Sequence, residues 1–224
     1  MKNSRRCKFT VIELLTVIAV FCIALTMLLP AVTSGTQRAK LTACAGNLRN
    51  IGQGVIFYSC DNSDLIPNIM PGLENASIPV LRLPGNNVLA LGRLINGYLP
   101  YAGVFGCPGS PGYEEQIVAQ NWQQNVMQMT WSAFLYRGGC ADFQPELFDP
   151  ANHNKAYIMD FACITNQGQQ FAPHDYRQSN LLYTDCHVEN RRNSAEPFKL
   201  YTVQAARHGE ITPDCSAIWQ RADR

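Results

Sequence analysis

The feature that most constrains this chain is an apolar run near its N-terminus that contains a single acid. Residues 9–32 read FTVIELLTVIAVFCIALTMLLPAV, and Glu13 is the only charged side chain among them. A run of this length can cross a bilayer as one helix. A carboxylate inside such a span is costly, and it is therefore a functional candidate. The sequence predicts a head in water carried on one membrane helix, with Glu13 as the functional position of that helix.

Charge is distributed unevenly around this run. Four basic residues and no acid precede it, in the leader MKNSRRCK at residues 1–8. The chain has 18 basic and 17 acidic residues, so beyond Glu13 there are 14 bases and 16 acids, and the head is close to neutral. Basic residues that flank a span stay on the cytoplasmic side, which predicts a cytoplasmic N-terminus and a head outside. A near-neutral head gives no reason to expect binding to nucleic acid.

The apolar run continues into a second segment of helical character. It is longer than the core of a secretory signal, and no clear small-residue cleavage site follows it. Apolar residues keep recurring at roughly helical spacing through residues 33–60. We therefore expect one long helix over about residues 9–58, apolar all round in its first half and amphipathic in its second. Pro30 lacks a backbone N–H, which predicts a kink or local unwinding there.

Residues 61–224 are predicted to form an extracytoplasmic α+β head, in which a small antiparallel sheet packs on the amphipathic half of the helix. An isolated hairpin is marginal in water, so this packing is needed. In chain order we expect a loop with room for short extended pieces over residues 61–87, a helix over 88–99, a polar helix over 113–124, strands over 126–136, 155–164 and 180–189, a further strand over 198–205 and a short helix over 214–221.

Nine cysteines are many for a chain of this length. Seven follow the span and would lie outside the cytoplasm, where disulfides persist. Because seven is odd, at least one would stay free or pair between chains. No C-x-x-C or zinc-finger spacing occurs, and disulfides, buried free thiols and metal ligation all remain open. The seven candidates are Cys44, Cys60, Cys107, Cys140, Cys163, Cys186 and Cys215.

The segment FTVIELL at residues 9–15, behind its basic leader, resembles the processing motif of type IV prepilins and type II secretion pseudopilins. The resemblance implies a single-pass protein of the bacterial inner membrane with a pilin-like fold, which assembles with other pilin or pseudopilin subunits. It also implies cleavage between Lys8 and Phe9 by a prepilin peptidase, which then methylates the amine of Phe9. Glu13 corresponds to the family's glutamate, and Pro30 corresponds to its helix-breaking proline. The residue before the cut is usually Gly, so either the host's peptidase accepts Lys8 or the leader is retained.

Weaker similarity continues into the head. CAGNLRNIG at residues 44–52 resembles the C-x-x-N-L-x-x-I-G segment of a pilin-like subfamily of planctomycete- and lentisphaera-type bacteria, and Cys107-Pro108 resembles its C-P-S segment. His174 and the later Asp185-Cys186 resemble its C-terminal H-x9-D-G motif. Ten residues separate His174 from Asp185 in this chain, and Cys186 stands in place of the glycine.

The acid at position 13 has two physical explanations. After cleavage the chain would begin with a positive amine in the bilayer, and pairing that amine with Glu13 of a neighbouring subunit would lower the cost of burying both charges and set the register between subunits. Alternatively, Glu13 caps its own helix, because Thr10-x-x-Glu13 fits a capping box. The two roles are compatible, since a capping acid could change partner on assembly.

Candidate catalytic or metal-binding groups in the head are few. Asp185 and His187 are two residues apart on a predicted strand and could face one side, where with His174 they could ligate a metal. Alternatively, Asp185-Cys186-His187 closes a strand near a turn and makes local hydrogen bonds. No nucleophile elbow, P-loop, H-E-x-x-H or dinucleotide motif occurs, so we predict a structural subunit without catalytic activity or cofactor. The alternative function is a membrane-anchored binding or metal protein that does not polymerise. The full set of titratable candidates is His153, Asp160, His174, Asp175, Asp185 and His187, of which Asp160, His174, Asp185 and His187 are the metal candidates.

Overall fold

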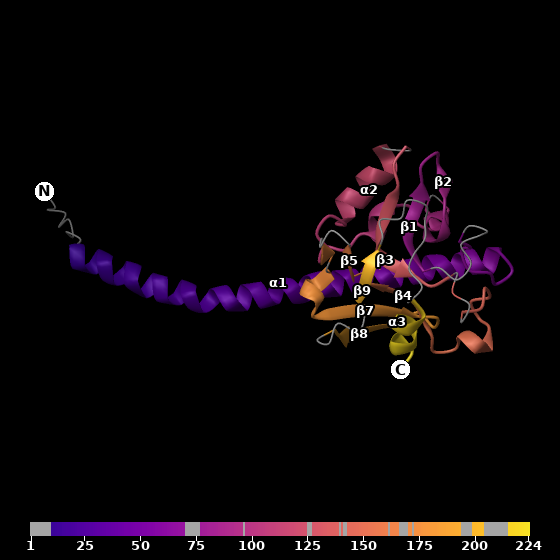
Figure 1. The fold of residues 1–224 in the computed structure, drawn as a ribbon. Coiled ribbons are helices and arrows are strands. Elements are labelled where there is room, and N and C mark those ends of the chain that lie inside the picture. The colour runs from indigo at the N-terminus through magenta and orange to yellow at the C-terminus, as the bar shows by residue number, and fades with distance from the viewer. Residues whose placement is uncertain are drawn as a thin grey trace, which may run out of the picture. The chain divides into compact units, whose positions relative to one another are not determined.

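The computed structural model describes residues 10–69, 77–95, 97–124, 127–138, 140, 143–160, 162–165, 170–171, 173–193, 199–203 and 215–224. The chain divides into two compact units, residues 1–39 and 40–224. The described part of the first unit belongs to a single helix, α1 (Val11–Asp61), and the second unit contains the rest of α1 together with the head. The long N-terminal helix and the α+β class expected from the sequence are confirmed (Figure 1).

Helix α1 is continuous over its whole length. It extends from two residues after the predicted start to three residues beyond the predicted end, and it passes through Pro30 without interruption. The local unwinding predicted at Pro30 is therefore not found. A proline removes one backbone hydrogen bond, and the apolar, helix-favouring residues on either side keep the helix intact. The hydroxyl of Thr33 also donates to the carbonyl oxygen of Pro30 at 3.0 Å.

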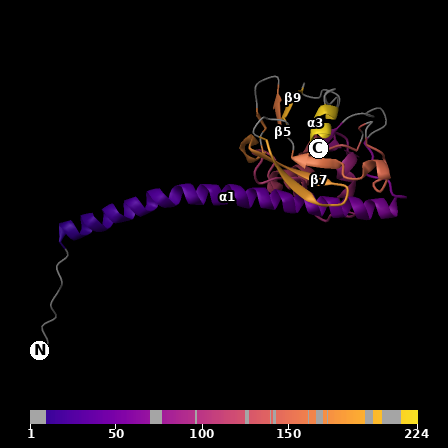
Figure 2. The same cartoon turned by 90° about the horizontal axis from the view of Figure 1, so that it is seen from below.

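The head is built on a six-stranded sheet in which every neighbouring pair is antiparallel (Figures 1 and 2). The antiparallel sheet expected from the sequence is therefore confirmed. Its strands, in the order in which they lie side by side, are β2 (Asn87–Val88), β1 (Ile78–Leu83), β3 (Thr130–Tyr136), β4 (Ala156–Asp160), β7 (Gln178–Tyr183) and β8 (Val188–Arg192).

The C-terminal half of α1 packs on one face of this sheet. Its buried apolar residues Cys44, Leu48, Ile51 and Val55 lie three or four positions apart and so form one stripe. They share a core with residues of the central strands, among them Phe134 of β3. The amphipathic second half predicted from the sequence is confirmed, and it forms the centre of the head's largest hydrophobic cluster.

The opposite face of the sheet is covered by a short helix, α3 (Cys215–Ala222). Trp219 of α3 is fully buried against Leu135 and other strand residues. Arg137, which is 1% exposed, follows β3 and donates from Nη1 to both carboxylate oxygens of Asp223 at 2.9 Å, which ties the end of α3 to the sheet. Because both faces are covered, the central strands are almost continuously buried, as expected for a sheet between two helical layers.

The remaining elements complete the second unit. A three-stranded sheet has the order β6 (Gln170–Phe171), β5 (Ala162–Thr165) and β9 (Lys199–Val203), with β5 and β9 parallel. Helix α2 (Glu115–Gln124) lies within the predicted polar helix. The described part of the head also contains four short 3-10 helices, η1 (Ala90–Leu94), η2 (Ala102–Phe105), η3 (Pro150–Asn152) and η4 (Pro173–Tyr176).

Three predicted elements in the head are wrong, whereas the expected loop over residues 61–87 does contain an extended piece, β1. The expected helix over 88–99 is replaced by the end of β2 and η1. The expected strand over 155–164 is two strands that belong to different sheets, and the expected strand over 180–189 is a hairpin of β7 and β8. In each case the pairing of strands determines where the element ends, within a hairpin for β7 and β8 and between different sheets for β4 and β5.

Candidate functional site

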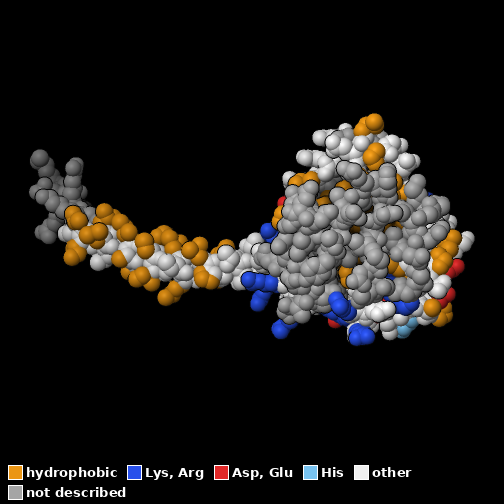
Figure 3. All heavy atoms as spheres, in the orientation of Figure 1, with side chains coloured by type: hydrophobic (Ala, Val, Ile, Leu, Met, Phe, Trp, Pro, Cys, Tyr) orange, Lys and Arg blue, Asp and Glu red, His pale blue; other side chains and the backbone are white. Residues whose placement is uncertain are grey.

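The N-terminal part of α1 exposes its apolar side chains. The large hydrophobic residues between Val11 and Val32 are 48–76% exposed, and Figure 3 shows hydrophobic side chains along this part of the helix. Among the described residues, α1 is the one helix long and apolar enough to cross a membrane, judged by length and composition. Single-pass anchoring through α1 is consistent with this finding.

Glu13 forms the predicted capping box with Thr10. The backbone N–H and the hydroxyl of Thr10 donate to Oε2 of Glu13 at 2.8 and 2.7 Å, and the N–H of Glu13 donates to the Thr10 hydroxyl at 3.3 Å. These bonds satisfy groups that the first turn of a helix leaves without intrahelical partners. The other two positions of the processing motif, Lys8 and Phe9, lie outside the described residues.

A disulfide links α1 to the loop that follows η2. Cys44 and Cys107 are bonded, with their Cα atoms 5.2 Å apart and a sequence separation of 63. Both cysteines are fully buried. Asn47, one turn along α1, joins the same segments, because its amide Nδ2 donates to the carbonyl of Gly106 at 3.1 Å and to Glu115 at 2.8 Å. The disulfide prediction is therefore confirmed for this pair.

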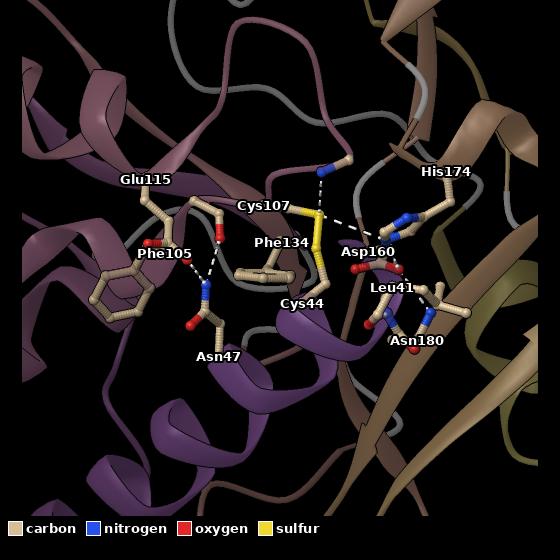
Figure 4. The surroundings of a disulfide bond; sticks show 12 residues. Leu41, Cys44, Asn47, Phe105, Cys107, Glu115, Phe134, Asp160, His174 and Asn180 are labelled. Atoms are coloured by element: carbon tan, nitrogen blue, oxygen red, sulfur yellow. Dashed lines mark hydrogen bonds and ion pairs between the residues drawn. A yellow bond between two sulfur atoms is a disulfide. The ribbon is translucent and has the colours of Figure 1, made fainter. Parts of the chain in front are cut away.

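Two of the predicted metal candidates meet at this disulfide (Figure 4). Nε2 of His174, in η4, lies 3.5 Å from Sγ of Cys107 and 3.6 Å from Oδ2 of Asp160, at the end of β4. Asp160 and His174 are 1% and 6% exposed. The four ligand atoms offered by Cys44, Cys107, Asp160 and His174 lie within 4.8 Å of one another. We refer to these four residues as the CCDH cluster.

The backbone around the CCDH cluster is shaped to bring His174 close. His174 has a φ of 54°, in the left-handed region that non-glycine residues rarely adopt. Its N–H donates to the carbonyl of Gly109 at 3.1 Å. A Cβ at position 109 would lie 2.5 Å from ring atoms of His174, so only glycine permits this approach. Residues strained in this way cluster at functional sites.

Burial raises the pKa of Asp160 to about 7. The main cause is loss of hydration, which disfavours the charged carboxylate. The backbone N–H of Asn180 donates to Oδ2 at 2.7 Å and acts in the opposite direction. Among the described residues, Oδ1 of Asp160 has no hydrogen-bond donor. The cluster therefore contains a buried carboxyl oxygen without a hydrogen-bond partner among the described residues.

The other two metal candidates lie elsewhere. Asp185 and His187 are in the exposed turn between β7 and β8, where Oδ1 of Asp185 accepts from the N–H of His187 at 3.0 Å and lies 2.5 Å from its Nδ1. The expectation that they share one side of a strand is wrong, because this segment is a turn. The turn contains instead the local hydrogen bond between Asp185 and His187 that was the alternative explanation.

The remaining cysteine candidates do not join this disulfide. Cys60 is an exposed thiol at the end of α1, and Cys186 is a partly buried thiol in the β7–β8 turn. Cys140 is buried, with its Sγ 3.0 Å from Oγ of Ser77. The side chains of Cys163 and Cys215 lie outside the described residues.

The sequence alone does not bring the parts of the CCDH cluster together. From the sequence, Cys44 and Cys107 are two of seven possible disulfide partners, and His174 is expected beside Asp185 and His187. The signals that pointed to the cluster were the motif-like segments around Cys44, Cys107 and His174, which each contribute one residue to it. Their convergence depends on contacts across more than 60 residues of chain.

No family model matches this sequence, and no curated protein or solved structure is significantly similar to it.

Proposed function

We propose that this chain is a pilin-like structural subunit, anchored through the N-terminal part of α1 and assembled into a type IV pilus or a type II secretion pseudopilus. The observation that carries the proposal is that one continuous helix has two different surfaces. Its apolar side chains are exposed between Val11 and Val32, and from Cys44 onward one face forms the centre of the head's core. Exposed apolar surface of this extent needs a partner. Lipid before assembly and neighbouring helices afterwards would supply it.

The charge pattern supports an orientation with the N-terminus in the cytoplasm of a bacterium and the head outside its inner membrane. The leader at residues 1–8 is basic, and basic flanks stay on the cytoplasmic side. The Cys44–Cys107 disulfide supports an oxidising environment for the head.

The turn after β7 supports the resemblance to the H-x9-D-G motif. The residue in the position of the motif's glycine is Cys186, and it has a φ of 67°. That left-handed conformation suits glycine, which has no Cβ to clash. The backbone in this chain thus has the conformation for which the motif's glycine is best suited.

Under this proposal Glu13 has two successive partners. Before assembly it caps α1 through Thr10, as the hydrogen bonds show. During assembly the carboxylate would pair with the N-terminal amine of a neighbouring subunit, created by a prepilin peptidase that cuts between Lys8 and Phe9 and methylates the amine. The pair would specify register more than it would add stability, because buried ion pairs are close to neutral in net free energy.

Two matched variants separate the cap from the charge. Glu13→Gln removes the charge but keeps an oxygen that can accept from Thr10, since glutamine also serves in capping boxes. Thr10→Ala removes the capping hydroxyl but keeps the charge. We expect Glu13→Gln to reach normal membrane levels and to be absent from sheared filaments, whereas Thr10→Ala is incorporated.

Mass spectrometry of the mature N-terminus tests processing directly. An N-methylated Phe9 in filament-associated protein is the expected result. Incorporation of Glu13→Gln at the wild-type level would refute the proposed charge pairing. An intact Met1 in a chain that never leaves the membrane would refute the filament role and favour the alternative, an anchored binding or metal protein.

A further inference from the structure

We infer that the CCDH cluster is a metal site for a zinc-type divalent ion when Cys44 and Cys107 are thiols, so that the disulfide and the bound metal are alternative states of one site. The cluster offers two sulfurs, one imidazole nitrogen and one carboxylate oxygen, all within 4.8 Å of one another and all buried. Cysteine sulfur, histidine nitrogen and carboxylate oxygen are all ligand types that zinc takes in proteins, usually four at a time in a tetrahedral arrangement. The inference does not depend on filament assembly.

The spacing of the ligand atoms fits tetrahedral coordination. Zinc bonds of about 2.3 Å to sulfur and about 2.0–2.1 Å to nitrogen or oxygen place neighbouring ligand atoms about 3.4–3.8 Å apart. Nε2 of His174 lies 3.5 Å from Sγ of Cys107 and 3.6 Å from Oδ2 of Asp160. All the ligand atoms lie within 4.8 Å of one another, and the two bonded sulfurs separate once the bond between them is reduced. The two distances from Nε2 of His174 therefore already match those of a tetrahedral site.

Groups around the cluster would support a bound cation. The N–H of Gly109 points at Sγ of Cys107 at 3.3 Å, which stabilises negative charge on that sulfur. The N–H of Asn180 holds Oδ2 of Asp160 at 2.7 Å and so orients the carboxylate. Oδ1 of the same carboxylate is buried without a donor in the described part of the chain. Burying such an oxygen is costly, and a nearby cation offsets that cost.

Exchange between the two states balances in electrons and protons. A dithiol reductant transfers two electrons and two protons to the Cys44–Cys107 disulfide, giving two thiols and the disulfide of the reductant. The divalent ion then displaces the two thiol protons, which pass to water. Oxidation of the two thiolates back to the disulfide by a disulfide oxidant removes the sulfur ligands and releases the ion.

The test uses the full chain in detergent micelles. One sample is unfolded and refolded with a phosphine reductant and either Zn²⁺ or Co²⁺, and a second is kept oxidised. After gel filtration we expect one ion per reduced chain and no ion above background in the oxidised chain. The Co²⁺ form should show the intense visible bands of tetrahedral geometry and an ultraviolet thiolate-to-metal charge-transfer band.

Variants identify the ligands. We expect His174→Gln and Asp160→Asn each to weaken Zn²⁺ binding by about 100-fold or more, because losing even an outer-shell partner of a ligand costs about 10–100-fold. The matched control is the double variant Asp185→Asn/His187→Gln, which alters the exposed pair in the β7–β8 turn and should bind Zn²⁺ as the wild type does. Cys186→Ser controls for a thiol outside the cluster.

A measurement on the wild type keeps the inference falsifiable if a variant does not fold. X-ray absorption at the zinc edge of the reduced chain should show two sulfur and two nitrogen or oxygen neighbours. A shell without sulfur would overturn the inference. A reduced chain that binds no stoichiometric metal would also overturn it. So would a result in which His174→Gln keeps full affinity for Zn²⁺ while the control variant Asp185→Asn/His187→Gln loses it.

Discussion

Removing the Cys44–Cys107 disulfide should destabilise the head by about 4 kcal/mol. The bond closes a loop with a sequence separation of 63. In the chain-entropy model, opening such a loop returns about 14 cal/mol/K to the unfolded chain, which is about 4 kcal/mol at 25 °C. Domains of this kind have total stabilities of about 5–15 kcal/mol, so the double variant Cys44→Ala/Cys107→Ala should retain only part of its stability.

Urea unfolding in detergent micelles measures this effect in the head alone. All three tryptophans, Trp122, Trp131 and Trp219, lie in the unit over residues 40–224, so their fluorescence does not report on the apolar part of α1. A chelator in every sample keeps metal away from reduced chains. Cys186→Ser is the matched control, since Cys186 is a free thiol in the same unit. This prediction would be refuted if the double variant lost less than about 1 kcal/mol of unfolding free energy, or if the control lost as much as the double variant. Either result would mean that the Cys44–Cys107 bond does not stabilise the head by restricting its unfolded chain.

Three further outcomes follow from the packing and charge of the head. Gly92→Ala places a Cβ against a backbone carbonyl of β1 and should cost about 2 kcal/mol in urea unfolding, whereas Gly46→Ala, with open space around it in α1, should stabilise by about 0.5–1 kcal/mol. Asp223→Ala leaves the buried Arg137 guanidinium without its carboxylate and should cost about 3 kcal/mol, with a red shift of tryptophan fluorescence as α3 loosens. Burial raises the pKa of Asp160 from 3.8 to about 7. Between these two pH values the folded chain holds a proton that the unfolded chain has released. The stability contributed by this group is therefore fully present below pH 3.8 and is lost as the pH rises through about 7. Asp160→Asn should flatten the pH dependence of the unfolding free energy, measured by urea titration of the oxidised chain. An unchanged pH dependence would contradict this prediction.

The elements predicted best are those determined by local sequence. Helix α1 was expected over residues 9–58 and extends over Val11–Asp61, because hydropathy and helical spacing act within a few turns. The strands β3, β4 and β7 lie within or overlap predicted segments, because a sheet covered on both faces needs apolar residues on both sides of each strand.

The failures occur where the pairing of segments, or an unusual turn residue, decides the structure. The apolar spacing of residues 88–99 fits a helix, yet the N–H of Leu89 donates to the carbonyl of Leu81, which draws this segment against β1. The hairpin of β7 and β8 was hidden because its turn has Cys186, not glycine, at a φ of 67°. Turn chemistry is read from glycine, asparagine and proline, and a cysteine in that conformation gives no such signal.

The CCDH cluster could not be assembled from the sequence because its four residues come together only in the fold. His174 and Asp185 resemble two halves of one motif, but they lie in different parts of the fold. His174 is drawn to the disulfide by the carbonyl of Gly109, while Asp185 accepts from the N–H of His187 in a turn. Similarity to a motif indicates which residues matter, and only the fold indicates which of them act together.

The position of the disulfide connects the two proposals of function and metal binding. Cys44 is the first buried residue of α1, so the covalent bond holds the helix at the point where it enters the core. If the apolar part of α1 is held in a filament, a pulling force on the helix reaches this turn before it reaches Leu48 or Ile51. A disulfide resists such a force as a covalent bond, whereas a metal with ligands from α1, β4, η4 and the loop after η2 resists it through four weaker bonds. The redox state of one cysteine pair would then determine how firmly the head is attached to its helix.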